Sequence, residues 1–172
     1  MCLGCSTTVL FPTPDTRLYL LAAALGSATI SRAEERRVEN LKKLGYNAIR
    51  TSHNPVSPAF LDACDKYGVL VMHEAFDCFD QGKNSNDYHV YFDDWWQRDL
   101  ASMVKRSINH PSIVLWSIGN EIPMRETTAG QKLYHDLAAE VRSIDPTRFV
   151  SSAIPMVKCV FPIAIGPLWV LI

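Results

Sequence analysis

Short apolar runs alternate with amphipathic segments through the middle of the chain, and this alternation constrains the fold more than any other feature. Four runs have the composition and length of buried strands: 46–50, 69–72, 113–118 and 148–152. Apolar residues at spacings of three and four predict helices over about 31–44, 57–67, 93–108 and 133–144. Strands that are apolar on both faces and separated by helices indicate a parallel sheet covered by helices. The sequence therefore predicts an α/β fold.

Capping residues mark where these helices are expected to begin. Ser31 and Glu34 have the spacing of a capping box at the start of the first helix. Ser57 followed by Pro58 is a common start for the second helix. The Asp93–Asp94 pair favours the start of the third helix. These signals support the boundaries that the apolar periodicity predicts.

A barrel and an open doubly wound sheet both fit this alternation. The glycine-rich phosphate-binding turns G-x-G-x-x-G and G-x-x-x-x-G-K-[ST], which many open sheets carry, do not occur in the sequence. At 172 residues the chain is also shorter than the ~200 residues of the smallest complete (β/α)₈ barrels. We therefore expect a partial (β/α)₈ TIM barrel of about four βα units. In such barrels the chemistry lies where the strands end, and polar residues gather there: Arg50, His53, Asn54, Glu74, Asp77, Asn120 and Glu121.

Glu121 is the sharpest candidate for chemistry among these residues. It follows a buried strand and neighbours Trp116 and Ile118, so we expect a poorly solvated carboxyl group, which suits a general acid near neutral pH. Asn120 offers an amide that can hold a substrate hydroxyl. The alternative is that Glu121 is an ordinary acid in the first turn of a helix and Asn120 a loop residue. The Asn-Glu dipeptide alone does not decide between them.

Longer motifs around these residues give a more specific indication. They are NAIRTSHNP (47–55), ACDKYGVLVM (63–72), HEAFD (73–77) and NHPSIVLWSIGNE (109–121). In this order they closely resemble the barrel domain of glycoside hydrolase family 2, which includes the β-galactosidases and β-glucuronidases. The resemblance covers about residues 31–153 and is greatest to bacterial members of the β-galactosidase type. It implies a hydrolase that cleaves O-glycosidic bonds of β-linked sugars in carbohydrate metabolism.

The resemblance also implies roles for the polar residues at the strand ends. Glu121 would be the catalytic acid/base, and Asn120 would contact the 2-hydroxyl group of the sugar. The other candidates would line the sugar site at the ends of the second and third strands: Arg50, His53, Asn54, Glu74 and Asp77.

Structural roles remain open for several of these residues. Arg50 could instead form a buried pair with Glu74, and His53 and Asn54 could merely shape the turn before Pro55.

No cofactor is expected from the residues themselves. The resemblance allows Mg²⁺ near the acid/base, but no metal-ligand spacing supports it independently. Cys2-x-x-Cys5 has the spacing of half a zinc site, and no second Cys/His pair at ligand spacing accompanies it.

One catalytic group that the resemblance implies has no counterpart in the chain. A retaining glycosidase needs two carboxylates about 5–5.5 Å apart, one acting as acid/base and the other as nucleophile. The resemblance places the nucleophile at the end of the seventh barrel strand, but no Asp or Glu follows Asp145. We therefore expect a fragment of a larger enzyme, a natural truncation or an incomplete gene model, that is weakly active or inactive alone. The alternative from another class is a non-catalytic sugar-binding or association module.

The distribution of charge divides the chain into three segments. Residues 1–30 form an atypical N-terminal segment, 31–153 the partial barrel, and 154–172 an apolar tail whose one charged residue is Lys158. The tail is shorter than the ~20 residues of a membrane-spanning helix, so no membrane span is expected. A net charge of −1 gives no reason to expect a nucleic-acid partner. The expected partners are a carbohydrate substrate and, through unpaired sheet edges, a second copy of the chain; the compartment could be bacterial cytoplasm or periplasm.

Overall fold

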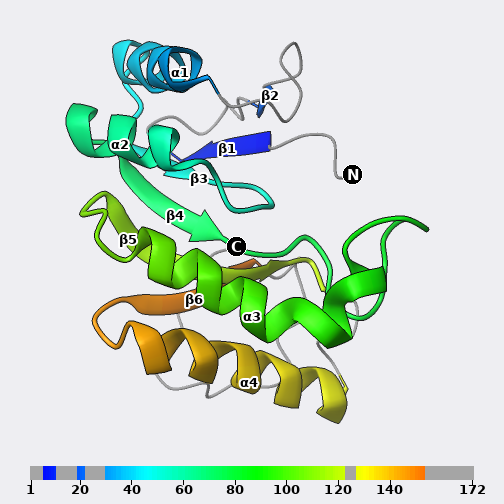
Figure 1. Cartoon of the computed structure of the whole chain (residues 1–172). Coiled ribbons are helices and arrows are strands. Elements are labelled where there is room, and N and C mark those ends of the chain that lie inside the picture. The colour runs from blue at the N-terminus through cyan, green and yellow to red at the C-terminus, as the bar shows by residue number, and fades with distance from the viewer. Residues whose placement is uncertain (1–5, 11–18, 22–29, 123–126, 154–172) are drawn as a thin grey trace.

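The computed structural model describes residues 6–10, 19–21, 30–122 and 127–153, and the following description concerns these residues (Figure 1). The strands are β1 (Ser6–Leu10), β2 (Tyr19–Leu21), β3 (Ala48–Arg50), β4 (Leu70–Glu74), β5 (Ile113–Asn120) and β6 (Phe149–Ala153). The helices are α1 (Ser31–Lys43), α2 (Pro58–Tyr67), α3 (His89–Ser107) and α4 (Thr128–Ile144). The apolar tail expected over 154–172 and the Cys2-x-x-Cys5 motif lie outside the described residues.

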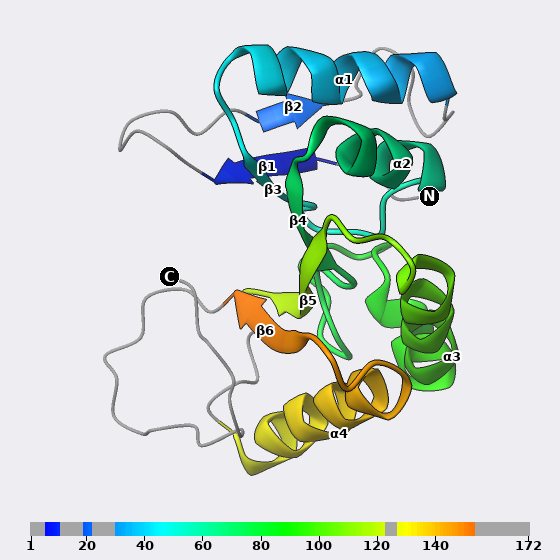
Figure 2. The same ribbon diagram turned by 90° about the vertical axis from the view of Figure 1, so that its left-hand side faces the viewer.

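Four of the strands form a parallel sheet in the order of the sequence. A six-stranded sheet has the order β2-β1-β3-β4-β5-β6, in which β3 to β6 pair in parallel and a helix separates each from the next. Figure 2 shows the four helices along one side of this sheet, from α1 at the top to α4 at the bottom. Sequential order with helices on one side is the arrangement of a barrel wall, whereas a doubly wound sheet reverses its order and has helices on both faces.

The first two strands depart from a barrel. β1 pairs antiparallel with β2 and, on its other edge, antiparallel with β3. All strands of a (β/α)₈ barrel are parallel. The barrel-like part of the described chain therefore begins with α1 and β3.

Helix α2 begins and ends as its sequence predicts. The hydroxyl of Ser57 accepts a hydrogen bond from the backbone N–H of Phe60, and Pro58 occupies the first turn, where a missing N–H costs nothing. Gly68 ends the helix with φ of 63°, a left-handed conformation that glycine adopts without strain. The β4 strand follows at once, so this helix leads directly into the strand that ends at Glu74.

One predicted helix cap and one predicted helix start were wrong. Helix α1 begins at Ser31 as predicted, but the carbonyl of Ile30 accepts its first backbone hydrogen bonds, and Glu34 pairs with Arg37 rather than closing a capping box. Helix α3 begins at His89, one turn before the Asp93–Asp94 pair that was expected to start it.

The core lies between the parallel strands and the helices that cover them. Trp116 on β5 is fully buried, and its indole N–H donates to Asp145 Oδ2 at 2.8 Å. Phe79 and Phe92 stack with ring centroids 5.1 Å apart, close to the end of β5. None of the helices among the described residues is both long and apolar enough to cross a membrane.

Candidate active site

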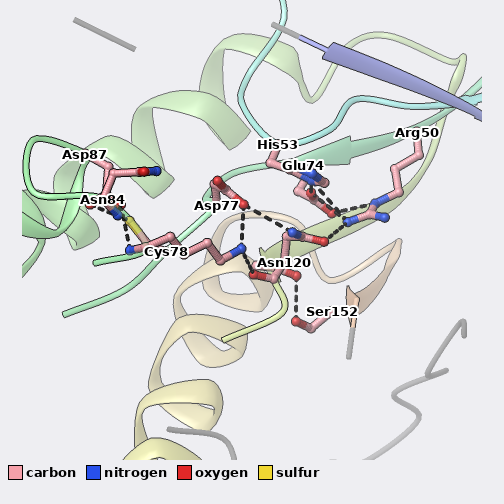
Figure 3. A network of polar contacts seen from close by, with 11 residues as sticks. Arg50, His53, Glu74, Asp77, Cys78, Asn84, Asp87, Asn120 and Ser152 are labelled. Carbon is pink, nitrogen blue, oxygen red and sulfur yellow. Dashed lines mark hydrogen bonds and ion pairs between the residues drawn. The ribbon is translucent and has the colours of Figure 1, made fainter. Parts of the chain in front are cut away.

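The ends of β3, β4 and β5 bring three of the predicted site residues into direct contact. Arg50, Glu74 and Asn120 are the last residues of these strands. The guanidinium of Arg50 donates to both oxygens of Glu74, from Nε to Oε2 at 2.8 Å and from a terminal nitrogen to Oε1 at 2.9 Å. The same terminal nitrogen donates to Asn120 Oδ1 at 2.7 Å. Figure 3 shows these side chains as one continuous polar network.

Glu74 is the buried centre of this network. Its side chain is fully buried and accepts further hydrogen bonds from His53 Nδ1 at 2.8 Å and from the Ser117 hydroxyl at 2.6 Å. Burial alone would raise the pKa of Glu74, but the hydrogen bonds from His53 and Arg50 outweigh it and hold the pKa below its ordinary value. Glu74 is therefore a carboxylate anion held in a fixed position. The buried ion pair of Arg50 and Glu74, one of the structural roles left open by the sequence, is present.

Asn120 and Asp77 extend the network toward the loop that follows β4. Asn120 Nδ2 donates to Asp77 Oδ1 at 3.1 Å, so both ends of its amide are engaged. Asp77 Oδ1 also accepts from Lys83 Nζ at 2.7 Å, and the same ammonium group donates to the backbone carbonyl of Asn120 at 2.9 Å. Sequence reasoning missed Lys83, since a lone lysine in a polar loop carries no pattern that points to a strand thirty residues or more away.

Glu121 lies immediately beyond the network, and its surroundings differ from those expected. Its side chain is exposed, so the poor solvation expected from Trp116 and Ile118 is wrong for the described chain. The reason is that those side chains belong to β5 itself, while nothing described packs over the residue that follows the strand. Its backbone N–H donates to the Ala153 carbonyl at 2.8 Å, and its φ is 49°. A left-handed conformation is uncommon for a residue with a side chain.

Gly119 allows the end of β5 to pack closely. A Cβ atom at this position would lie 2.8 Å from the Phe79 ring and 3.2 Å from Ile122. The Gly119 carbonyl accepts from the Ser152 hydroxyl at 2.7 Å. Gly119, which precedes Asn120, is thus held by the packing of Phe79 and by the hydrogen bond from Ser152.

Asn54 is the one predicted site residue that lies apart from these contacts. It is half-buried and lines a cavity of about 300 Å³ together with Asp77, Tyr88 and Arg106. The structure therefore brings six of the seven predicted residues to one rim and places the seventh against a neighbouring cavity.

Comparison with known proteins identifies the family. A family model described as "Glycosyl hydrolases family 2, TIM barrel domain" matches residues 26–154, about three quarters of the chain. The chain belongs to glycoside hydrolase family 2. The resemblance inferred from the motifs is thereby confirmed, and so is the partial TIM barrel.

Named relatives in this family differ in the sugar that their names give. The chain is 50% identical over 98 residues to the β-galactosidase BoGH2A of Bacteroides ovatus, and the match covers 57% of this chain and 12% of that enzyme. It is 34% identical over 119 residues to human β-glucuronidase, covering 66% and 17%. A solved family 2 structure from Bacteroides cellulosilyticus superposes with a TM-score of 0.71 at 46% identity, covering 78% and 18%. The chain thus spans only a small part of the glycoside hydrolases that it matches.

The described residues near Glu121 do not form a metal site in this family 2 chain. The carboxylates of Glu74 and Asp77 already bind Arg50 and Lys83. One group of ligand-type side chains does occur in the described part: Asp62, Asp65 and His110 have ligand atoms within 4.8 Å of one another. His110 precedes β5 and so lies at the opposite end of that strand from Asn120. Among the described residues, the rim therefore offers no group of three metal ligands, and Mg²⁺ near the acid/base stays a prediction.

His73, beside Glu74 on β4, makes the stability of the chain sensitive to acid. Its Nε2 accepts from the Val56 N–H at 3.2 Å, and its buried Nδ1 has no hydrogen-bond partner among the described residues. Burial, with smaller contributions from the nearby charges of Arg106 and His110, lowers the pKa of His73 to about 3. The unfolded chain binds this proton near pH 6.5, so stability is present above that pH and is lost as the pH falls toward 3.

We expect the free energy of unfolding to fall by about 2 kcal/mol more between pH 7 and 4.5 in the natural chain than in a His73→Gln variant. Urea unfolding of both proteins across this range measures the difference. The glutamine keeps a carbonyl that can accept from Val56 but has no titrating proton. Parallel pH profiles in the two proteins would show that His73 does not cause the acid sensitivity.

Proposed function

We propose that this chain supplies the acid/base and one wall of the sugar site of a retaining β-glycosidase that acts on β-galactoside-like substrates. The observation that carries the proposal is the network of Arg50, Glu74 and Asn120 at the strand ends, which leads directly to an exposed carboxyl group at Glu121. The high identity to a β-galactosidase supports the choice of sugar.

In the first step, a nucleophile supplied from outside this chain bonds to the anomeric carbon, the bond from that carbon to the glycosidic oxygen breaks, and the protonated carboxyl of Glu121 gives its proton to the departing oxygen. In the second step, water attacks the anomeric carbon, the bond to the nucleophile breaks, and the Glu121 carboxylate takes a proton from that water. Asn120 is held by Arg50 and Asp77, so its amide is presented at a constant position beside the reacting sugar. His53 binds Glu74 through Nδ1, which leaves Nε2 as the nitrogen able to meet a sugar hydroxyl.

The nucleophile must come from outside this chain. Glu74 is held by Arg50 and His53, and Asp77 by Lys83, so neither carboxylate is free to attack an anomeric carbon. No Asp or Glu follows Asp145. The 172-residue chain alone is therefore expected to hydrolyse 4-nitrophenyl β-galactoside and β-glucuronide no faster than its Glu121→Gln variant.

A hybrid enzyme tests the proposal. The part of the BoGH2A barrel domain that corresponds to the family match, residues 26–154 of this chain, is replaced by those residues, so that the rest of BoGH2A supplies the missing groups. The expected result is a folded hybrid that hydrolyses 4-nitrophenyl β-galactoside. A folded hybrid without turnover would contradict the proposed function, and so would turnover by the isolated chain that persists in its Glu121→Gln variant.

An association module is the second candidate function. Within the described residues β6 pairs with β5 on one edge and with no strand on the other. An unpaired strand edge can accept a strand of another chain. Light scattering coupled to size-exclusion chromatography tests this second candidate. A concentration-dependent dimer favours an association module, and a monomer at all concentrations argues against one.

A further inference from the structure

We propose that Lys83 is a positioning residue, which holds the peptide between Asn120 and Glu121 and thereby directs the Glu121 carboxyl group. The inference rests on the proposed function of Glu121. The ammonium group of Lys83 donates to the Asn120 carbonyl at 2.9 Å and to Asp77 Oδ1 at 2.7 Å. The carbonyl belongs to the same peptide group as the Glu121 N–H.

That peptide is held at both of its polar atoms. The Asn120 carbonyl accepts from Lys83, and the Glu121 N–H donates to the Ala153 carbonyl at 2.8 Å. Rotation of the peptide would break both hydrogen bonds. Glu121 has φ of 49°, a conformation that side-chain-bearing residues disfavour and keep only where their surroundings impose it. The two hydrogen bonds supply that constraint.

The loop that carries Lys83 is itself braced. Asp87 Oδ2 accepts from the backbone N–H groups of Lys83 and Asn84, each at 2.8 Å, and Asp87 Oδ1 accepts from Cys78 Sγ at 3.2 Å (Figure 3). Gly82 permits this packing, since a Cβ atom there would lie 2.3 Å from the His89 ring. The backbone of Lys83 is therefore fixed before its side chain reaches across to β5.

Charge explains why a lysine suits this position. Its side chain is about one quarter exposed and lies between the Asp77 carboxylate and a carbonyl dipole, both of which attract a cation. Asp77 also accepts from the Asn120 amide, so one carboxylate orients both the lysine and the asparagine. The ion pair of Lys83 and Asp77 therefore connects the loop after β4 to the end of β5, where Glu121 lies.

Amide hydrogen exchange in the 172-residue chain tests the positioning role without any need for turnover. We expect Lys83→Met to speed exchange of the Glu121 N–H by about 10-fold or more, while core amides such as those of Val71 and Trp116 keep their rates. Lys83→Arg should retain most of the protection, since its guanidinium can reach both acceptors. Lys132→Met is the matched control, because Lys132 is exposed on α4 and pairs only with Asp136 in the described structure.

Kinetics of the BoGH2A hybrid give the second measurement. Lys83→Met should lower kcat about 10-fold to 100-fold with KM nearly unchanged, because positioning acts in the transition state, and Lys83→Arg should recover most of the loss. Unchanged Glu121 exchange in Lys83→Met overturns the inference, whatever the kinetics. Faster exchange in an inactive hybrid upholds the positioning of the peptide and overturns the proposed function instead. If Lys83→Met fails to fold, Lys83→Leu, whose side chain also has no donor, provides the same comparison.

Discussion

Replacing Arg50 with leucine is expected to lower the free energy of unfolding by about 3–5 kcal/mol, because it leaves a buried carboxylate without its cation. Glu74 is fully buried, and Arg50 binds both of its oxygens at 2.8 and 2.9 Å. The substitution also removes the donor to Asn120. Urea unfolding at pH 7, followed by circular dichroism, measures the change.

Two further variants make this result interpretable. Lys132→Ala removes an exposed ion pair with Asp136 on α4 and should cost less than about 0.5 kcal/mol. Arg50→Leu combined with Glu74→Leu removes both charges and should recover part of the lost stability, since the unpaired charge is the main penalty. A loss below about 1 kcal/mol in Arg50→Leu would mean that water reaches Glu74 and that the network does not hold the strand ends together.

Glu121→Gln in the BoGH2A hybrid is expected to lower kcat/KM by about 10²- to 10⁴-fold, because glutamine has the shape of the acid but no proton to give. The loss should depend on the leaving group. An alkyl β-galactoside needs its departing oxygen protonated, whereas 2,4-dinitrophenolate departs as a stable anion. We therefore expect a large loss for the alkyl substrate and a much smaller one for the dinitrophenyl substrate.

The control for this substitution is Glu140→Gln. Glu140 lies on α4 and accepts a hydrogen bond from Gln97 at 2.9 Å, away from the strand ends. Its substitution should leave kcat/KM unchanged for both substrates. An equal loss for both leaving groups in Glu121→Gln would indicate a disturbed site rather than a missing proton donor, and no loss at all would assign the acid to another residue.

Most of the barrel-like part of the fold could be predicted from the sequence. Runs such as Ile113–Ile118 and the helix start at Ser57 are local signals, because burial on both faces and helix capping depend on neighbouring residues. The antiparallel pairing of β1 with β3 could not be predicted, since pairing between distant segments leaves no periodic pattern in the chain. The capping box at Ser31 was wrong although it is a local signal, because the carbonyl of the preceding Ile30 accepts the N–H bond of Glu34 that the Ser31 hydroxyl was expected to accept.

The candidate site divides in the same way. Residue types and motifs were sufficient to select the polar strand ends and to indicate the family, which the match over 26–154 confirmed. The catalytic role of Glu121 stays a prediction that the hybrid must test. Its exposure was not predictable from its apolar neighbours on β5, because solvation depends on what packs over the end of the strand.

The amino-acid sequence by itself determined the alternation of buried strands and helices, the family, and the absence of any Asp or Glu after Asp145. Only the tertiary structure decided which groups hold one another: Glu74 locked by Arg50, and Lys83 placed against the Asn120 carbonyl. The physical reason is the separation along the chain over which each kind of interaction acts. Periodicity and motifs record interactions between neighbours in the chain, whereas hydrogen bonds between the ends of separate strands exist only once the sheet has brought those ends together.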